Sequence, residues 1–423
     1  MNNFAKIPGS LFCICFLIST TSARAAWDIS PAAQISTQWS DNVRMSPDSK
    51  ESALVSTATG QIRLRNVTET SEVSVAAGLS FLKYSYVDGL EDQDIQFLNF
   101  SARQKRQRLT FGFTGSYRRD VMLRRSAFIS DSGEGFSNSN PIDEGDTPED
   151  FPALNEDPDL DDSLTRIQVR RERIRVSPSF SWRLSERMNT RLGLTYSELN
   201  YGQNGTLVGL QDNKNQGVSL SIRRRITDKD SLSLNGSASF FKPGLSPDSQ
   251  NYVLKAVWGH KTSERSDVRF ELGIRRTERD SGLIQNSSRN TGFVFRVRGN
   301  RQYENMQIQA VAERSVYPGS FGQLVETDRL TLNLNRDLAE RTKFSLSARA
   351  FRIDTDSDTP GRNDREYLQI SPLVSYRMSP AFTAQFSYEY TWIDRKQINV
   401  IDSGTAEGHA VSLAISYTPP RPF

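Results

Sequence analysis

The sequence predicts an all-β fold, a single transmembrane antiparallel β-barrel of about 18 strands. Two observations lead to this prediction. After residue 50, apolar and polar side chains alternate almost everywhere with a period of two, which is the period of a β-strand. Short polar turns and longer polar connections also follow one another in strict alternation. A barrel with short periplasmic turns and long extracellular loops produces this second pattern.

The first 25 residues are expected to be a signal peptide. Lys6 provides a positive charge ahead of the apolar run Leu11–Ser19, and Ala23-Arg24-Ala25 fits a small-x-small cleavage site. The apolar run is too short for a membrane-spanning helix, which needs about 20 residues; a membrane anchor is the alternative interpretation. The barrel is therefore expected over residues 26–423.

The two cysteines, Cys13 and Cys15, both lie inside the expected signal peptide. A mature chain without cysteine can hold neither a disulfide nor a cysteine-based metal site. The remainder is polar and has no run of 18 apolar residues. Because a barrel strand shows only every second side chain to lipid, a low mean hydropathy fits a barrel as well as a soluble protein.

The strands can be followed by their alternation. It is clear in segments 109–114, 268–275, 330–335, 382–392 and 411–417. The strands run to nearly a dozen residues, enough for the roughly 9–11 that a tilted strand needs to cross a membrane. A soluble β-sandwich, the alternative, has strands of about 5–6 residues and no reason to alternate its loop lengths.

The connections give the strand count. The short turns are Thr68–Ser71, Gln104–Gln107, Ser185–Met188, Thr227–Asp230, Thr262–Ser266, Gln302–Glu304, Ala339–Thr342 and Ser379–Ala381. The long connections are Asp41–Ser52, Val87–Asp94, Asp120–Thr165, Asn200–Asn213, Pro243–Asp248, Asp280–Ser288, Pro318–Gly322, Asp354–Asp364 and Lys396–Ala406. Eight turns and nine long connections predict 18 strands, with both chain ends on the periplasmic side.

Aromatic residues are predicted to form two girdles at the membrane surfaces. By the up-and-down order, Trp39, Tyr390 and Trp392 fall near outer strand ends, and Trp182, Trp258, Tyr376 and Tyr417 near periplasmic ends. Amphipathic rings favour the two headgroup levels. Closure of the sheet is also required, because an open edge in hydrocarbon leaves backbone groups unpaired at several kcal/mol each.

The polar residue of each alternating pair should face the lumen, and these residues are biased towards positive charge. The fourteen cationic residues are Arg63, Arg65, Arg118, Arg175, Arg183, Arg223, Arg225, Arg269, Arg275, Arg296, Arg298, Arg329, Lys343 and Arg349, against Glu271, Glu313 and Glu389. The whole chain is only +3. The pattern indicates a pore that favours anions.

The alternative is that these arginines pair with carboxylates or contact lipid phosphates, above all Arg65, Arg118 and Arg225 at strand ends.

One long connection, residues 131–163, is expected to be an acidic extracellular loop. It carries 12 acidic residues between Asp131 and Asp162, and residues 126–165 contain no Lys or Arg. Its composition cannot build a packed core. It could stay solvated, fold into the basic lumen as a plug, or bind divalent cations at the surface. Residues of the possible plug are Asp143, Glu144, Asp146, Asp157, Asp159 and Asp161. The D-x-D-x-D run lacks the glycine of a calcium loop.

No catalytic site is predicted. The two histidines, His260 and His409, fall near opposite rims of the barrel, and no G-x-S-x-G, H-E-x-x-H, P-loop or dinucleotide motif occurs. We therefore expect no enzyme activity, no cofactor and no metal site. Nucleic acid is not an expected partner, because the arginines alternate along strands and form no single exposed basic face.

The mature N-terminus carries a resemblance. A first strand that reads Ile29-Ser30-Pro31-Ala32-Ala33-Gln34-Ile35-Ser36-Thr37-Gln38-Trp39 runs into Ser40-Asp41-Asn42-Val43, and alternating strands follow to an aromatic C-terminus. This resembles the β-barrel porin type 2 family. Members of that family often accompany exopolysaccharide export systems. The C-terminus departs from the usual ending, because three prolines separate Phe423 from the last strand and leave Tyr417 as its final aromatic residue.

The resemblance implies a passive outer-membrane conduit that exports an exopolysaccharide, with the arginines matched to an acidic glycan. Its expected partners are outer-membrane lipid, the barrel assembly machinery and a periplasmic polysaccharide-export protein. The first alternative is a porin-type channel for the uptake of small anionic solutes. A surface adhesin is a third class, and it would need a blocked lumen and ordered, aromatic-rich loops.

Overall fold

The computed structural model describes residues 27–87, 90–122, 168–202, 210–279, 288–318, 324–354, 363–397 and 404–420, and it forms one 18-stranded antiparallel sheet there. The strands are β1 (Trp27–Ser40), β2 (Ala53–Val67), β3 (Ser71–Ser85), β4 (Gln93–Lys105), β5 (Leu109–Met122), β6 (Val169–Ser185), β7 (Met188–Tyr201), β8 (Asn213–Arg225), β9 (Asp230–Pro243), β10 (Ser249–Ser263), β11 (Ser266–Arg279), β12 (Ser288–Gln302), β13 (Met306–Pro318), β14 (Leu324–Ala339), β15 (Thr342–Asp354), β16 (Asn363–Arg377), β17 (Phe382–Gln397) and β18 (Gly404–Tyr417).

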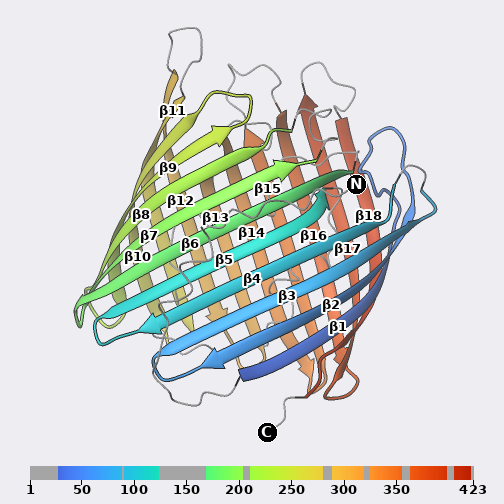
Figure 1. Ribbon diagram of the computed structural model, residues 1–423, viewed down its shortest axis with the longest axis horizontal. Coiled ribbons are helices and arrows are strands. Elements are labelled where there is room, and N and C mark those ends of the chain that lie inside the picture. The colour runs from blue at the N-terminus through green and yellow to red at the C-terminus, as the bar shows by residue number, and fades with distance from the viewer. Residues whose placement is uncertain are drawn as a thin grey trace, which may run out of the picture.

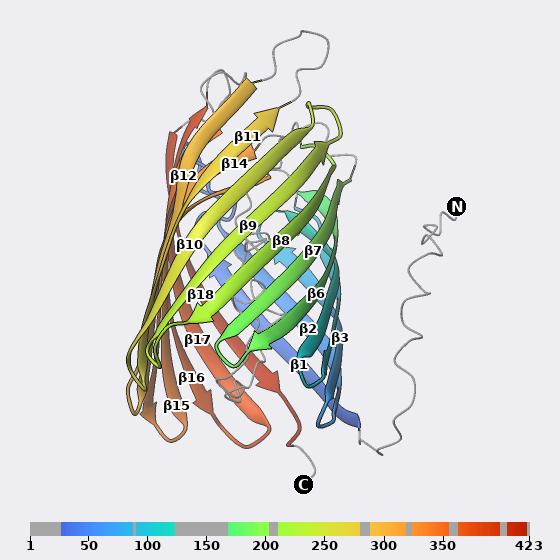
Figure 2. The same ribbon diagram turned by 90° about the vertical axis from the view of Figure 1, so that its left-hand side faces the viewer.

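The sheet closes into a barrel (Figures 1 and 2). Each strand pairs with the next, and β1 pairs with β18 in antiparallel register from Ala33↔Tyr417 to Ser40↔Ala410. The closed 18-stranded barrel predicted from the sequence is confirmed. No helix long and apolar enough to span a membrane occurs in the residues that the structure describes.

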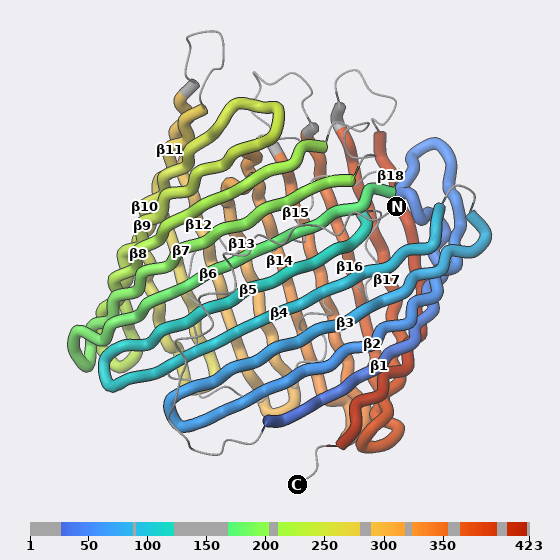
Figure 3. Tube along the Cα trace, in the orientation of Figure 1, coloured from blue at the N-terminus to red at the C-terminus, as the bar shows by residue number. Residues whose placement is uncertain are grey.

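The connections alternate in length as predicted. The turns at one rim are short, for example residues 186–187 between β6 and β7 and 340–341 between β14 and β15. The strand ends that the long connections join lie at the opposite rim, which runs from the top to the right-hand side of Figure 3. Strand β1 begins and β18 ends at the rim with the short turns. The strands hold 13 to 17 residues, which exceeds the length needed to cross a bilayer.

The two faces of the wall differ as a membrane barrel requires. On the outer face, Ile35 is 68% exposed and Leu272 is 65% exposed, whereas the inward-facing Ser412 is 2% exposed. Large apolar side chains left open to the surroundings are stable only against lipid. The aromatic residues predicted for the girdles include Trp39, Trp182, Trp258, Tyr376 and Tyr417, which are all exposed.

Above the apolar band, the outer face becomes charged towards the rim with the long loops. Opposite charges meet there, with Arg170 Nη2 2.9 Å from Asp94 Oδ1 and Lys214 Nζ 3.4 Å from Glu198 Oε1. Exposed pairs of this kind stabilise a protein by about 1 kcal/mol or less. Their main consequence is positional, because charged side chains mark where the hydrocarbon ends.

Among the described residues the interior holds small separate apolar clusters and no continuous apolar core, and bulky inward-facing side chains need small neighbours. Phe97 of β4 lies over Gly78 of β3, where a Cβ atom would stand 2.3 Å from the ring. Glycine is therefore the one residue that fits beneath this ring. The expected signal peptide and the acidic segment 131–163 lie outside the described residues.

The assignment of the two faces of the wall predicts that one added charge lowers stability by different amounts on the two faces. We expect Leu254→Arg, which points a guanidinium charge into lipid from β10, to lower the free energy of unfolding by about 2–4 kcal/mol. Ser237→Arg, at the same height on β9 but inward, should change it far less. Urea titration of barrels folded into phosphatidylcholine vesicles, followed by tryptophan fluorescence, measures both. Equal losses would contradict the assignment of the two faces.

Candidate functional site: the inner wall and the loop at its mouth

The strand register assigns each charged side chain to a face. Residues of the same parity as the exposed Leu and Ile side chains face outward, and their neighbours face inward. By this criterion the inward positions include Arg63, Arg65, Arg118, Arg175, Arg183, Arg223, Arg225, Arg269, Arg275, Arg296, Arg298, Arg329, Lys343 and Arg349, together with Glu271, Glu313 and Glu389.

Strands β5 to β8 form a basic sector of the inner wall. Its inward-facing cations are Arg118, Arg171, Arg173, Arg175, Arg183, Arg191, Arg223 and Arg225. Within these four strands Asp120 is the one acidic residue on the inner face. Its carboxylate accepts hydrogen bonds from Arg118 Nε at 2.8 Å and from Arg171 Nε at 2.9 Å and Nη2 at 3.0 Å. On the inner faces of these four strands, arginines therefore outnumber carboxylates eight to one.

Strands β11 to β14 form an ion-paired sector. Glu271, Arg296, Glu313 and Arg329 stand side by side at one height, each opposite the next in the ladder. Glu313 Oε2 lies 3.1 Å from Arg296 Nε, and its Oε1 lies 3.2 Å from Arg329 Nη1. Lys255 Nζ of β10 lies 3.9 Å from Glu271 Oε2. Charges of both signs alternate along this row, so their fields largely cancel a few ångströms away.

Strand-end arginines have local partners, which answers part of the alternative interpretation given above. Arg65 donates to Glu72 Oε1 from Nε at 2.9 Å and from Nη2 at 2.7 Å. Arg225 Nη2 donates to the carbonyl oxygen of Glu186 at 2.8 Å. These two arginines therefore stabilise the rim with the short turns by hydrogen bonds, and they also give that rim positive charge.

Several inward-facing cations were missed from the sequence: Arg171, Arg173, Arg191, Lys255, Arg365 and Arg395. In β6 the run Arg170-Arg171-Glu172-Arg173 hides the alternation, because charged residues occupy both faces where the strand leaves the membrane. Counting back by two from Arg175 would have identified Arg171 and Arg173.

The first long loop, residues 41–52 and called L1 here, packs against inward-facing side chains at the mouth of the barrel. Val43 lies in a cluster with Ala53, Val55, Leu82 and Ile95. The last three are inward positions near the extracellular ends of β2, β3 and β4. L1 therefore covers part of the inner wall instead of standing away from the rim.

A second contact holds L1 on the other side of the barrel seam. Met45 is buried among Ile393, Ala406 and Tyr367, inward positions of β17, β18 and β16. Arg395 Nη1 donates to the carbonyl oxygen of Met45 at 2.9 Å. Because L1 contacts β2–β4 and β16–β18 together, it bridges the strands that flank the β1–β18 closure.

The motif Asp41-Asn42-Val43 is the anchor of L1. The amide of fully buried Asn42 donates from Nδ2 to the carbonyl oxygens of Ser46 and Glu407, both at 3.0 Å, and its Oδ1 accepts from Ser46 N at 2.9 Å. Asp41 Oδ1 accepts from His409 N at 2.6 Å. Every polar group of the Asn42 side chain is thus bonded, which burial of an amide demands.

Nothing in the described residues assembles a catalytic site. His260 Nδ1 lies 2.8 Å from Asp230 Oδ1 near one rim, and His409 Nδ1 lies 2.7 Å from the Tyr388 hydroxyl near the other. No group of three or more potential metal ligands occurs in the described part of the chain.

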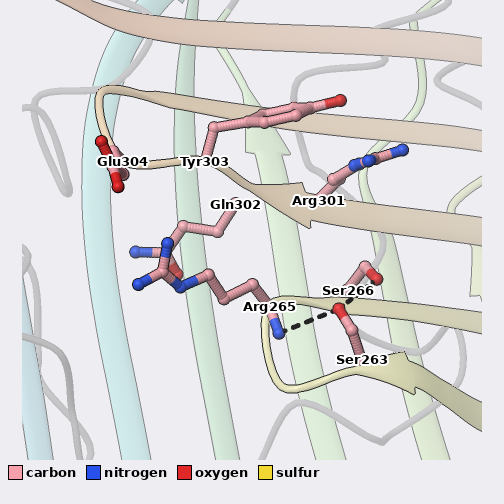
Figure 4. Close-up of a pocket in the computed structure, with 7 residues that line it drawn as sticks. All are labelled: Ser263, Arg265, Ser266, Arg301, Gln302, Tyr303 and Glu304. Carbon is pink, nitrogen blue, oxygen red and sulfur yellow. Dashed lines mark hydrogen bonds between the residues drawn. The ribbon is translucent and has the colours of Figure 1, made fainter.

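A shallow hollow between two short turns also presents no catalytic arrangement among the described residues. It is lined by Ser263, Arg265, Ser266, Arg301, Gln302, Tyr303 and Glu304 (Figure 4). In it the Arg265 N–H donates to Ser263 Oγ at 3.2 Å, and Arg301 lies over the Tyr303 ring. These contacts fix the turns and present no acid–base pair. The candidate plug residues Asp143, Glu144, Asp146, Asp157, Asp159 and Asp161 lie outside the described residues.

Solved structures of outer-membrane proteins resemble this barrel. Pseudomonas aeruginosa OccK2 (OpdF), solved with glucuronate, is 8% identical over 93% of this chain and 97% of that chain, with a TM-score of 0.48. P. aeruginosa OprD is 12% identical over 95% of this chain and 97% of that chain, with a TM-score of 0.45. Acinetobacter baumannii OccAB2 is 7% identical over 93% of this chain and 98% of that chain, with a TM-score of 0.46. No family model and no curated protein matches the chain, so its resemblance to the β-barrel porin type 2 family stays a prediction.

The anchor of L1 predicts a measurable loosening. In Asn42→Ala, Ser46 N and the Glu407 carbonyl oxygen lose their partner, at about 1–3 kcal/mol for each buried group left unsatisfied. We expect trypsin to cut after Arg44, whose side chain is 17% exposed in the folded loop, faster in the variant than in the wild type. Ser49→Ala, in the exposed part of L1, is the control. Equal cleavage rates in Asn42→Ala and the wild type would show that Asn42 does not hold the loop.

Proposed function

We propose that the protein is an outer-membrane channel that favours small anionic solutes. The observation that carries the proposal is the basic sector, because the inner faces of β5–β8 hold eight arginines and one carboxylate, that of Asp120. A water-filled lumen with low-dielectric walls focuses the field of such a sector and raises the local concentration of anions.

The position of the acidic residues strengthens the argument. Glu271 and Glu313 are engaged by Lys255, Arg296 and Arg329 on the far strands, and so do little to offset the arginines of β5–β8. The Debye length is about 8 Å at physiological ionic strength. A solute passing close to β5–β8 is therefore governed by that sector, and the distant ion pairs are screened.

The docked loop favours small solutes over a polymer. Val43 and Met45 hold L1 against the inner wall on both sides of the closure, which takes up space at the extracellular mouth. A solute of a few ångströms can pass beside such a loop, whereas a polysaccharide must thread it along its whole length. This supports uptake of small anions ahead of the export that the family resemblance implies.

Export of an acidic polysaccharide remains the second candidate because two separate parts of the inner wall carry mainly neutral polar side chains. Inward residues of β8, β9 and β18 include Asn215, Ser219, Ser221, Ser233, Asn235, Ser237, Ser412 and Ser416, and β9 and β18 carry no charge on this face. Hydroxyl and amide groups give many weak, exchangeable contacts, which suit a sliding polymer. This candidate includes a periplasmic export protein as partner.

A deletion strain separates the two candidates. Small-anion uptake and secreted polysaccharide are measured in the same cells, with the wild-type gene restored as control. Loss of anion permeability with normal polysaccharide is the expected result. Loss of polysaccharide alone would replace the proposal with the export function.

The basic sector predicts the direction of ion selectivity. In planar bilayers with a KCl gradient, we expect the wild type to prefer chloride. Arg175→Gln combined with Arg191→Gln should lower the chloride-to-potassium permeability ratio by roughly twofold or more, because such focused fields change local ion concentrations by about tenfold or more. Arg224→Gln removes an outward-facing charge from β8 and is the matched control. A reversal potential unchanged in the double variant would refute the role of this sector.

A further inference from the structure

The wall contains a seam between β12 and β13. Their ladder runs from Gln302↔Gln307 up to Phe295↔Arg314 and then stops. Both strands continue, β12 to Ser288 and β13 to Pro318, and each keeps its other neighbour, as Arg279↔Ser288 and Pro318↔Leu324 show. The unpaired stretch covers seven residues of β12 and four of β13; among the described strands, β4 and β5 also part near the rim, over three residues of each.

Side chains from both faces of the wall meet in this seam. Arg275, an inward residue of β11, lies across Gly292 of β12, where a Cβ atom would stand 3.1 Å from the guanidinium carbon. Its Nη2 forms an ion pair with Glu326 of β14. Glu326 has outward parity, two residues from Asp328, which pairs with outward-facing Arg314. An inward arginine can reach an outward carboxylate across two strands only where the wall is not closed by a ladder.

The outer side of the seam is closed by a second arginine. Arg314 Nε and Nη2 each lie 2.6 Å from a carboxylate oxygen of Asp328, and Nε lies 3.5 Å from Glu326 Oε1. The Arg314 guanidinium also stands over the Phe293 ring, 4.8 Å from its centroid. Glu326 thus joins Arg275 on the lumen side to Arg314 on the lipid side.

The seam lies where the hydrocarbon ends. Outward residues on its periplasmic side are apolar, with Leu330 56% exposed and Leu332 37% exposed. On its extracellular side Arg276 and Arg289 surround Glu278. Unpaired backbone groups inside hydrocarbon cost several kcal/mol each, but at this height water and lipid headgroups can bond to them. The position makes an unpaired seam tolerable.

We propose that the β12–β13 seam is a lateral passage between the lumen and the outer leaflet for a single-chain amphiphilic anion. The anionic head replaces Glu326 as partner of Arg314 and then of Arg275, while the apolar tail follows over Phe293 and Phe295. Two arginines placed in series across the wall suit an anionic head, and the rings beside them suit a tail. This role goes beyond axial passage of small anions and uses none of the basic sector on β5–β8.

The test closes the seam with a disulfide bond. Val294→Cys with Ser315→Cys places two cysteines at the positions that would come opposite each other if the ladder continued past Phe295↔Arg314. The full barrel is reconstituted in vesicles with fluorescent lysophosphatidic acid in the outer leaflet. Albumin, which is too large for the pore, removes the probe that has stayed outside, and the retained fraction measures transfer. Val297→Cys with Ala312→Cys, in the part already paired, is the matched control.

We expect oxidation to reduce transfer by the Val294/Ser315 cysteine pair to the rate of protein-free vesicles, and reduction to restore it. The control pair should transfer the probe in both states, and Glu326→Gln should transfer it faster than the wild type. Equal transfer before and after oxidation would overturn the proposal, as would no transfer by both the wild type and Glu326→Gln. Chloride conductance of the same vesicles, expected to persist in the locked barrel, tests the axial channel separately.

Discussion

The structure depends on the need of every backbone N–H and C=O group in the wall for a partner that hydrocarbon cannot supply. The ladder from Ala33↔Tyr417 to Ser40↔Ala410 meets this need by joining the first strand to the last. Closure of an up-and-down sheet with 18 strands brings both ends to one rim. It also leaves every second side chain, such as Ile35 and Leu413, against lipid and commits the others to water. The alternating connections and the polar lumen both follow from this one requirement.

Given a polar lumen, the placement of its few carboxylates decides its electrostatics. Arginines occur on the inner face of strands around much of the barrel, but Glu271 and Glu313 stand in one row with Arg296 and Arg329. On the inner faces of β5–β8, by contrast, Asp120 is the one carboxylate among eight arginines. The lumen is therefore asymmetric, with its carboxylates gathered in the ion-paired row of one side, although the chain as a whole carries a net charge of only +3.

The short motif at the end of β1 shows how a local sequence signal acquires its meaning from distant residues. Asp41 and Asn42 read as a polar turn after a strand, and such a turn is all that their own neighbourhood requires. In the fold their bonds run to His409 and Glu407 on β18, more than 360 positions away, and Val43 packs on the inner wall. The turn is consequently part of the closure and holds L1 over the mouth.

The sequence by itself determined the barrel, its 18 strands, its rims and the inward side of residues such as Arg175, Arg296 and Glu313. Each follows from a period of two and from connection length, both of which are local properties. Arg171 and Arg173, which the sequence analysis missed, could have been assigned to the inner face by counting every second residue along β6. Only the tertiary structure decided that Glu313 bonds Arg296 and Arg329, that Asn42 reaches β18, and that β12 parts from β13. Those depend on register between strands, which is set by closure of the whole sheet and is not encoded in any one strand.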